Sequence, residues 1–162
     1  MDARVRRPHP RREGEALLSA RAVEAAFRRA QNRHSKSGNV CHHFTYHRLT
    51  CDDYDRLHAR AEGRCELCRT PAHATGGRRL VVDHFESARP YVRVIRGMLC
   101  DACNSVMSCL DGTKKWGPRR NELEPKAREY QARVLRDLPA PQTELIERIQ
   151  QRRREFLITP LP

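Results

Sequence analysis

Residues 80–104 have the sequence LVVDHFESARPYVRVIRGMLCDACN. Two apolar runs within this stretch, residues 80–82 and 91–95, are typical of short strands. Residues 99–110 are typical of a helix, which Gly112 would stop, because glycine often follows the last turn of a helix. We therefore expect two strands followed by a helix, an α+β arrangement.

Paired cysteines lie on either side of the predicted strands. Cys65 and Cys68 form one Cys-x-x-Cys pair, and Cys100 and Cys103 form the other. Two thiolates at this spacing can occupy neighbouring corners of a tetrahedron, so two pairs complete a Cys₄ zinc site. Disulfides and unrelated buried cysteines are the alternatives, and a reducing compartment disfavours disulfides. Because four protein ligands leave no open position, we expect this zinc to be structural.

Three further cysteines, Cys41, Cys51 and Cys109, lie outside these pairs. Cys41, His42 and His43 together with His47 could form a second metal site, because His43 and His47 are four residues apart, a spacing that places two ligands on one face of a helix. The residues between them are more typical of a strand or loop. We therefore favour histidines that pack or face solvent over a second metal site.

A carboxylate and an imidazole, Asp83 and His84, end the first predicted strand. Asn104 follows the second cysteine pair and lies about 100° around the helix axis from Cys103. The oxygens of Asp83 and Asn104 are hard ligands that suit Mg²⁺, and His84 can take a proton from water near neutral pH. Consecutive strand residues point to opposite faces, so Asp83 and His84 share a site only if the chain bends between them. We expect the end of the strand to supply this bend.

Three motifs occur together in this chain: the first cysteine pair, the tripeptide Val82-Asp83-His84, and the run RGMLCDACN over residues 96–104. In this combination they resemble the recombination endonuclease VII family of phages. The lead-in from Leu49 to Cys65 is also similar to that family, so the resemblance covers roughly residues 49–112.

This resemblance implies a ββα-metal finger, the fold of His-Me finger and HNH-like nucleases, which cleaves DNA with one Mg²⁺ ion, for which Mn²⁺ could substitute. By the resemblance, Asp83 and Asn104 would hold the ion, and His84 would be the general base that activates water. The family often has a histidine two residues after the Asp-His pair, where this chain has Glu86. Glu86 is either an extra metal ligand or a solvent-exposed residue.

The composition indicates a polyanionic partner. The chain of 162 residues has a net charge of +12 and a pI near 10.1, and all but four of its 32 basic residues are arginine. Arginine holds phosphate with a planar fork, which suits contact with DNA. Four basic residues are candidate DNA contacts, with Arg96 as the phosphate clamp: Arg93, Arg96, Lys114 and Lys115. Solvated surface charge is the alternative for each of them.

We expect three segments along the chain: a basic N-terminal arm and helix over residues 1–48, the zinc finger over 49–112, and a C-terminal helical extension over 113–162. The expected fold is a small zinc-stapled ββα-metal finger between N-terminal and C-terminal α-helices. These flanking helices could supply the surface of a homodimer. No run is apolar enough for a signal peptide or a membrane span, which favours a cytoplasmic protein of a bacterium or a phage-infected cell.

The sequence thus favours a Mg²⁺-dependent endodeoxyribonuclease that hydrolyses phosphodiester bonds, with branched or junction DNA as one class of substrate. The first alternative is a non-catalytic, zinc-stabilised module that binds DNA or RNA. Such a module would need the cysteines and arginines but not Asp83, His84 and Asn104. The second alternative, a zinc-stapled structural protein, would need neither these three residues nor the positive charge.

Overall fold

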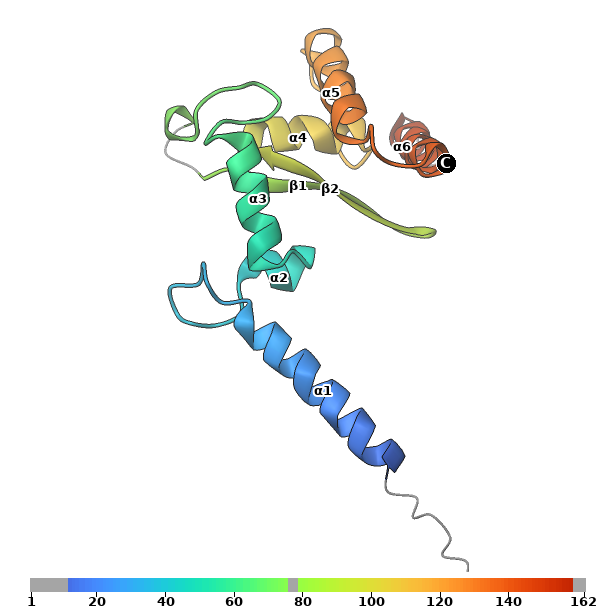
Figure 1. Cartoon of the computed structure of the whole chain (residues 1–162). Helices are drawn as coiled ribbons and strands as arrows, with labels where there is room; N and C mark the ends of the chain where they lie inside the picture. Colours follow the sequence, from blue (N-terminus) through green and yellow to red (C-terminus); the bar gives the residue numbers. More distant parts are fainter. Residues whose placement is uncertain (1–11, 76–78, 159–162) are drawn as a thin grey trace, which may run out of the picture. The chain divides into compact units, whose positions relative to one another are not determined.

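The computed structural model describes residues 12–75 and 79–158, and its contacts divide the chain into two compact units, Met1–Asp52 and Asp53–Pro162. The first unit contains α1 (Arg12–Ala30) and α2 (His42–His47), and its last two residues begin α3 (Cys51–Ala61). The remaining elements belong to the second unit (Figure 1): η1 (Ala72–Ala74), β1 (Val81–Ala88), β2 (Tyr91–Leu99), α4 (Asp101–Leu110), α5 (Arg120–Val134) and α6 (Ala140–Ile158). Helices combined with one small antiparallel sheet confirm the predicted α+β class.

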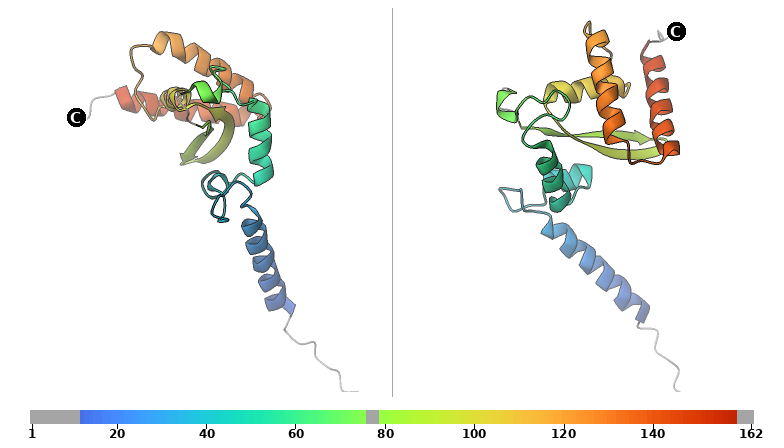
Figure 2. Two further views of the ribbon diagram at one scale, coloured as in Figure 1. Left: turned by 90° about the vertical axis from the view of Figure 1, so that its left-hand side faces the viewer. Right: turned by 45° about the horizontal axis from the view of Figure 1, so that its top comes forward.

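The order strand, strand, helix is present in the second unit. β1 and β2 form an antiparallel hairpin, and α4 follows β2 directly. α4 packs against both strands, and α5 packs against α4 and β2 (Figures 1 and 2). The second unit therefore contains the predicted order of two strands and a helix, together with the C-terminal helices.

Several elements differ from the sequence-based expectation. Both strands are longer than predicted, because alternating buried residues continue along β1 to Ala88 and buried residues continue along β2 to Leu99. The expectation of strand or loop around residues 44–46 is wrong, since these residues lie in α2. Within the described residues, no helix has the length and apolar character needed to cross a membrane.

A β-bulge lies at the Asp-His pair. The hairpin pairs Asp83 with Gly97 and His84 with Ile95, which leaves Arg96 as an extra residue on β2. A bulge of this kind bends the strand and increases its local twist. The predicted bend between Asp83 and His84 thus exists as a bulge. The predicted strand end at this point is wrong, because β1 continues past it.

Two apolar clusters stabilise the second unit. The first surrounds the paired cysteines and joins the open end of the hairpin, where β1 begins and β2 ends, to α4 and α5. Its buried members are Ala61, Cys65, Leu80, Met98, Leu99, Cys100, Cys103, Met107, Leu110, Ala127 and Tyr130. The second joins the other end of the hairpin to the end of α5 and to α6 through Phe85, Val92, Leu135, Ile146 and Ile149. The residues between these clusters position the candidate active site.

Gly97 is required by close packing beside the bulge. A Cβ atom at this position would lie 2.1 Å from Oε2 of Glu66 and 2.8 Å from both the Arg60 guanidinium and the Tyr130 hydroxyl. These groups are held by neighbouring contacts, since Glu66 accepts a hydrogen bond from the backbone N–H of Met98 and pairs with Arg60. The glycine in the motif RGMLC therefore allows β2 to approach α3 and α5 closely.

Candidate active site and metal centre

The paired cysteines converge on one point. The sulfur atoms of Cys65, Cys68, Cys100 and Cys103 all lie within 4.8 Å of one another, and the sulfurs of Cys68 and Cys100 are 4.0 Å apart. Zinc bound to thiolates at about 2.3 Å in a tetrahedron requires sulfur–sulfur separations of about 3.8 Å. The donor set and its spacing therefore fit a structural metal such as zinc, as predicted.

Local backbone geometry presents each cysteine pair. Cys65 and Cys68 lie on a tight turn in which the backbone N–H of Arg69 donates to the carbonyl of Cys65, and Arg69 adopts a left-handed conformation with φ of 61°. Cys100 is the N-cap of α4, and Cys103 lies in the first turn of this helix. A hydrogen bond with Cys103 lowers the pKa of the Cys65 thiol to about 4, against the opposing effect of burial. The same hydrogen bond raises the pKa of the Cys103 thiol.

Asp83 and Arg96 form a buried ion pair between the two apolar clusters. The Arg96 guanidinium donates to both carboxylate oxygens of Asp83 at 2.7 and 2.8 Å and to both oxygens of Asp111 at 2.8 Å. The side chains of Asp83 and Arg96 are each 1% exposed. Gln150 also donates to Asp111 at 2.8 Å, which joins α6 to this network.

The expected role of Arg96 as a phosphate clamp does not agree with this placement. Its guanidinium lies inside the protein and is held by two carboxylates, so a DNA phosphate would have to displace at least one of them. Sequence reasoning missed this because arginine is mostly a surface residue. Arg96 instead connects β1 to the end of α4.

The charges of this network do not balance, because two carboxylates share one guanidinium. Burial raises the pKa of Asp83, the Asp111 carboxylate raises it further, and the Arg96 guanidinium opposes both effects. Burial alone would lower the pKa of Arg96, but Asp83 and Asp111 outweigh burial and raise it. Arg96 therefore stays charged. Its single positive charge can neutralise only one of the two carboxylates.

His84 lies on the other face of β1. Its side chain is 33% exposed, and its Nε2 atom lies 3.7 Å from Oε2 of Glu86, which occupies the same face two residues further along. Arg93 on β2 completes this group, with its guanidinium 3.9 Å from the same Glu86 oxygen. The outer face of β1 thus presents an imidazole that solvent can reach beside a carboxylate and a guanidinium.

Asn104 lies in the first turn of α4 and is half-buried. Its backbone N–H donates to the carbonyl of Cys100 at 2.9 Å, and its carbonyl accepts from the Ser108 hydroxyl. Among the described residues, the side-chain amide of Asn104 makes no hydrogen bond. The structure therefore joins Asp83 to Arg96 and His84 to Glu86, and it links Asn104 to neither pair by a hydrogen bond.

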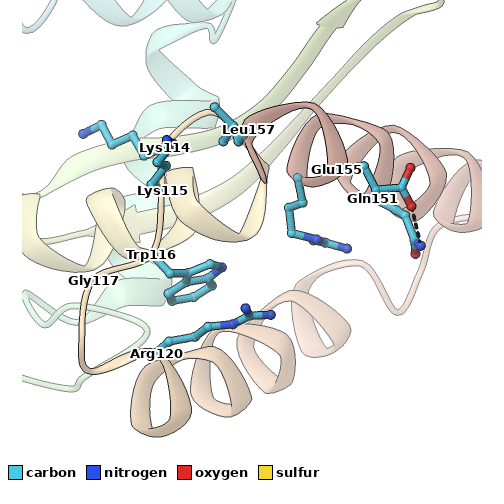
Figure 3. A pocket seen from close by; sticks show the side chains of 9 residues that line it. Lys114, Lys115, Trp116, Gly117, Arg120, Gln151, Glu155 and Leu157 are labelled. Carbon is cyan, nitrogen blue, oxygen red and sulfur yellow. Dashed lines mark hydrogen bonds between the residues drawn. The ribbon is translucent and has the colours of Figure 1, made fainter. Parts of the chain in front are cut away.

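A basic cavity follows α4. It has a volume of about 560 Å³ and lies between the loop after α4, the start of α5 and the last part of α6 (Figure 3). Four cationic residues line it: Lys114, Lys115, Arg120 and Arg154. The Trp116 indole lies beside the Arg120 side chain within it (Figure 3). Two of the predicted DNA contacts, Lys114 and Lys115, are therefore part of one cationic surface with an aromatic ring.

A second group of metal-ligating side chains lies in the first unit. His34 and Cys51 join Cys41 and His43 there, while His47 is not part of the group. The candidates from the sequence were Cys41, His42, His43 and His47, so His34 and Cys51 were missed. The four residues follow no regular spacing, and only their convergence in space reveals the set.

Comparison with known protein families identifies a match that covers the candidate site. The sequence model of a family described as recombination endonuclease VII matches residues 39–132, more than half of the chain. The matched region includes both cysteine pairs, Asp83, His84 and Asn104. No curated protein and no solved structure matches the chain.

Proposed function

Because the chain belongs to the recombination endonuclease VII family, we propose that it is a Mg²⁺-dependent endodeoxyribonuclease of the His-Me finger, HNH-like type. Membership of this family indicates a nuclease that acts on DNA. The proposal extends this to phosphodiester hydrolysis with His84 as general base. The observation that carries it is the placement of His84 on the outer face of the hairpin, in the unit that the Cys₄ site stabilises.

The surroundings of His84 support its role as base. A general base must reach the water that it deprotonates, and the imidazole is partly exposed. Oε2 of Glu86 lies on the same face, 3.7 Å from Nε2, close enough to restrict the orientation of the ring. The sequence left two roles open for Glu86, an extra metal ligand or an exposed residue. Its exposed carboxylate is compatible with both.

We propose Asp83 and Asn104 as the residues that hold Mg²⁺. A carboxylate and an amide oxygen are the hard donors that this ion prefers. The ion would stabilise negative charge on the scissile phosphate and on the leaving oxygen. The Asp83 carboxylate accepts two hydrogen bonds from Arg96, and an ionised carboxylate has about four lone-pair positions, so it retains acceptor capacity. Arg96 would then orient this carboxylate.

The burial of Asp83 favours a second candidate function. If Asp83 serves only as a partner of Arg96, the chain is a non-catalytic, zinc-stabilised module that binds DNA or RNA. The cysteine pairs and the basic surface would suffice for that function. The two candidates differ in whether DNA that is bound is also cut.

The basic residues supply the proposed contact with DNA. Lys114 and Lys115 lie on the cationic cavity, and Arg93 lies beside Glu86 near His84. Guanidinium and ammonium groups bind phosphates without regard to sequence, so binding should weaken steeply as salt is added. We further propose that branched or junction DNA is a substrate, that a homodimer places two active sites on it, and that the protein acts in the cytoplasm of a bacterium or a phage-infected cell.

Cleavage and binding should be measured on the same DNA. Supercoiled plasmid, linear duplex and a four-way junction are incubated with the purified chain in Mg²⁺, in Mn²⁺ and in EDTA, and a gel-shift assay in EDTA reports binding. We expect nicked or linear product in Mg²⁺ and Mn²⁺ and none in EDTA. Binding of all three DNAs without cleavage in either metal would instead identify the non-catalytic module.

A further inference from the structure

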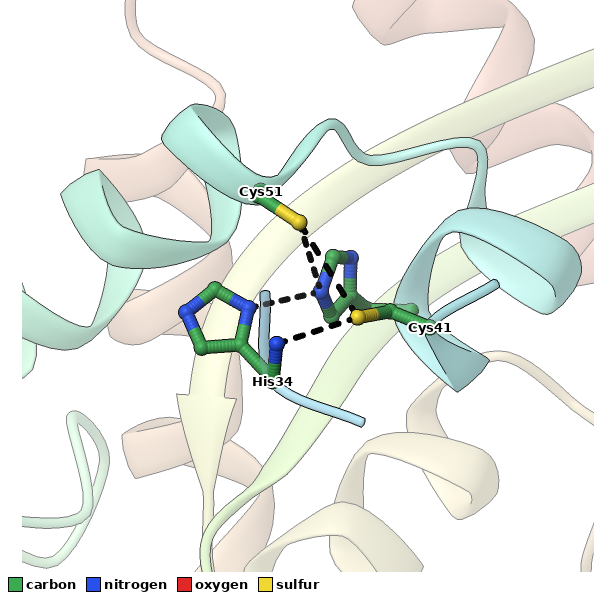
Figure 4. Close-up of side chains that lie close together, drawn as sticks. His34, Cys41 and Cys51 are labelled. Atoms are coloured by element: carbon green, nitrogen blue, oxygen red, sulfur yellow. Dashed lines mark hydrogen bonds between the residues drawn. The ribbon is translucent and has the colours of Figure 1, made fainter. Parts of the chain in front are cut away.

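Four side chains from three segments of the first unit meet at one point. His34 follows α1, Cys41 is the N-cap of α2, His43 lies in α2, and Cys51 begins α3. Their ligand atoms all lie within 4.8 Å of one another (Figure 4). All four residues belong to the unit Met1–Asp52, so the grouping does not depend on how the two units are placed.

The separations between these atoms match a tetrahedral zinc site. The sulfurs of Cys41 and Cys51 are 3.9 Å apart, Nδ1 of His34 is 3.0 Å from Nε2 of His43, and that Nε2 is 3.9 Å from the Cys51 sulfur. A tetrahedron with bonds of about 2.3 Å to sulfur and 2.0–2.1 Å to nitrogen requires about 3.8 Å between sulfurs and about 3.3 Å between nitrogens. The four donors therefore surround a space of the size of a zinc ion.

Neighbouring groups orient the donors. Nδ1 of His43 lies 2.8 Å from the carbonyl of Leu49, a contact in which the ring donates, and this leaves Nε2 as the atom that faces the group. The backbone N–H of His34 donates to the Cys41 sulfur at 3.2 Å. This hydrogen bond holds the Cys41 sulfur beside His34 and towards the other donors.

Gln31 fixes the backbone around the group. Its side-chain oxygen accepts from the N–H of Cys51 at 2.8 Å, and its carbonyl accepts from the N–H of Cys41 at 2.7 Å. Gln31 is itself 7% exposed. One buried residue at the end of α1 thus holds both cysteines in position.

The described side chains of the first unit include few that are buried. Within residues 20–52, the buried side chains are those of Gln31, Phe44 and three of the four grouped residues. Both apolar clusters of the protein draw their buried members from residue 61 onward. Small units without an apolar core commonly depend on a metal or on disulfides.

We propose that His34, Cys41, His43 and Cys51 bind a second zinc ion in a closed Cys₂His₂ site. Four protein ligands leave no position for a substrate, so this zinc is structural. It connects the end of α1, the start of α2 and the start of α3. The chain then contains two zinc sites of different donor sets, Cys₄ and Cys₂His₂.

Zinc content of the intact chain tests this directly. Protein purified under reducing conditions and dialysed against a weak chelator should contain two zinc ions per chain by elemental analysis. The Cys41→Ser and Cys51→Ser variants should each contain one. The control Cys109→Ser, which changes a cysteine outside both groups, should retain two. A matched histidine pair extends the test: His43→Asn should lose one zinc, and His42→Asn, an exposed neighbour, should lose none.

Wild-type protein remains informative if the variants fail to fold. Cobalt substitution should give absorption bands of both Cys₄ and Cys₂His₂ coordination, in a one-to-one ratio. One zinc per chain in the wild type, cobalt bands of Cys₄ coordination alone, or a disulfide between Cys41 and Cys51 in the reduced preparation would each overturn the proposal. None of these results depends on whether the protein cleaves DNA.

Discussion

The two faces of β1 place neighbouring residues of one motif in opposite environments. Asp83 points inward, is 1% exposed and is held by Arg96, whereas His84 points outward and is 33% exposed beside Glu86. The β-bulge at Arg96 lies between them. Through Asp83 and Arg96, the inner face holds the hairpin to α4 and α6, whereas the outer face presents His84 and Glu86 to solvent. A motif read from sequence gives the identities of such residues, but the strand decides which of them reaches solvent.

The largest expected effect on stability comes from the inner face. Arg96→Met leaves Asp83 and Asp111 buried without their shared cation, and the loss of one partner from a buried ion pair costs about 3–5 kcal/mol. Urea denaturation monitored by circular dichroism measures this loss. Arg93→Met on the outer face is the control, and it should change the free energy of unfolding by no more than about 1 kcal/mol. Equal losses in the two variants would remove the distinction between the faces.

Asp83→Asn and Asp111→Asn separate metal binding from structure. Both variants leave Arg96 with one carboxylate, and since two carboxylates share one guanidinium, each should cost only about 1–2 kcal/mol. Asp83→Asn should also reduce cleavage by at least about 100-fold, because it weakens the proposed Mg²⁺ site. Asp111→Asn should retain most of the cleavage rate. Similar rates in both variants would show that Asp83 acts only through Arg96.

Glu86→Gln tests the outer face with a smaller effect. Loss of its charge beside His84 should lower the cleavage rate by no more than about tenfold, if the carboxylate orients the base. Its free energy of unfolding should change by less than about 0.5 kcal/mol, since the side chain is exposed. Single-turnover kinetics and urea denaturation give the two values. A loss as large as that of Asp83→Asn would point to Glu86 as a metal ligand.

The smallest expected effect is a shift in the pKa of Glu122, a surface carboxylate that serves as a reference for the buried Asp83. Hydrogen bonds from Arg119 and Lys126 lower the pKa of Glu122 to about 2. A lowered pKa in the folded state favours folding above the ordinary carboxylate pKa, and this contribution is lost as the pH falls towards 2. Added salt should raise the pKa of Glu122 towards its ordinary value, because surface charges are screened. NMR titration of its side chain at low and high salt measures this shift.

The sequence was sufficient to predict the Cys₄ site because its ligands come in two short, regular pairs. Two thiols on one tight turn and two on the first turn of α4 need only the hairpin between them to converge. The order strand, strand, helix followed from apolar runs and from the position of Gly112. These features depend on local spacing, which one sequence displays.

The burial of Arg96 and the second cysteine–histidine group depend on contacts between distant residues. Arg96 donates hydrogen bonds to Asp111, 15 positions away in the sequence, and to Gln131, 35 positions away. No periodic sequence pattern indicates such partners. His34 and Cys51 are 17 positions apart and were not associated with Cys41 for the same reason. A search for every Cys and His near an unexplained cysteine, regardless of spacing, would have included all four.

Cleavage by wild-type protein and by His84→Ala, compared on the same supercoiled plasmid, tests the central claim most directly. We predict metal-dependent nicking or linearisation by the wild type and a rate at least about 100-fold lower in the variant, with equal zinc content and equal stability. Cleavage at the wild-type rate by His84→Ala would contradict the assignment of the base. Absence of cleavage by the wild type in Mg²⁺ and Mn²⁺, with DNA binding retained, would contradict the proposed nuclease itself.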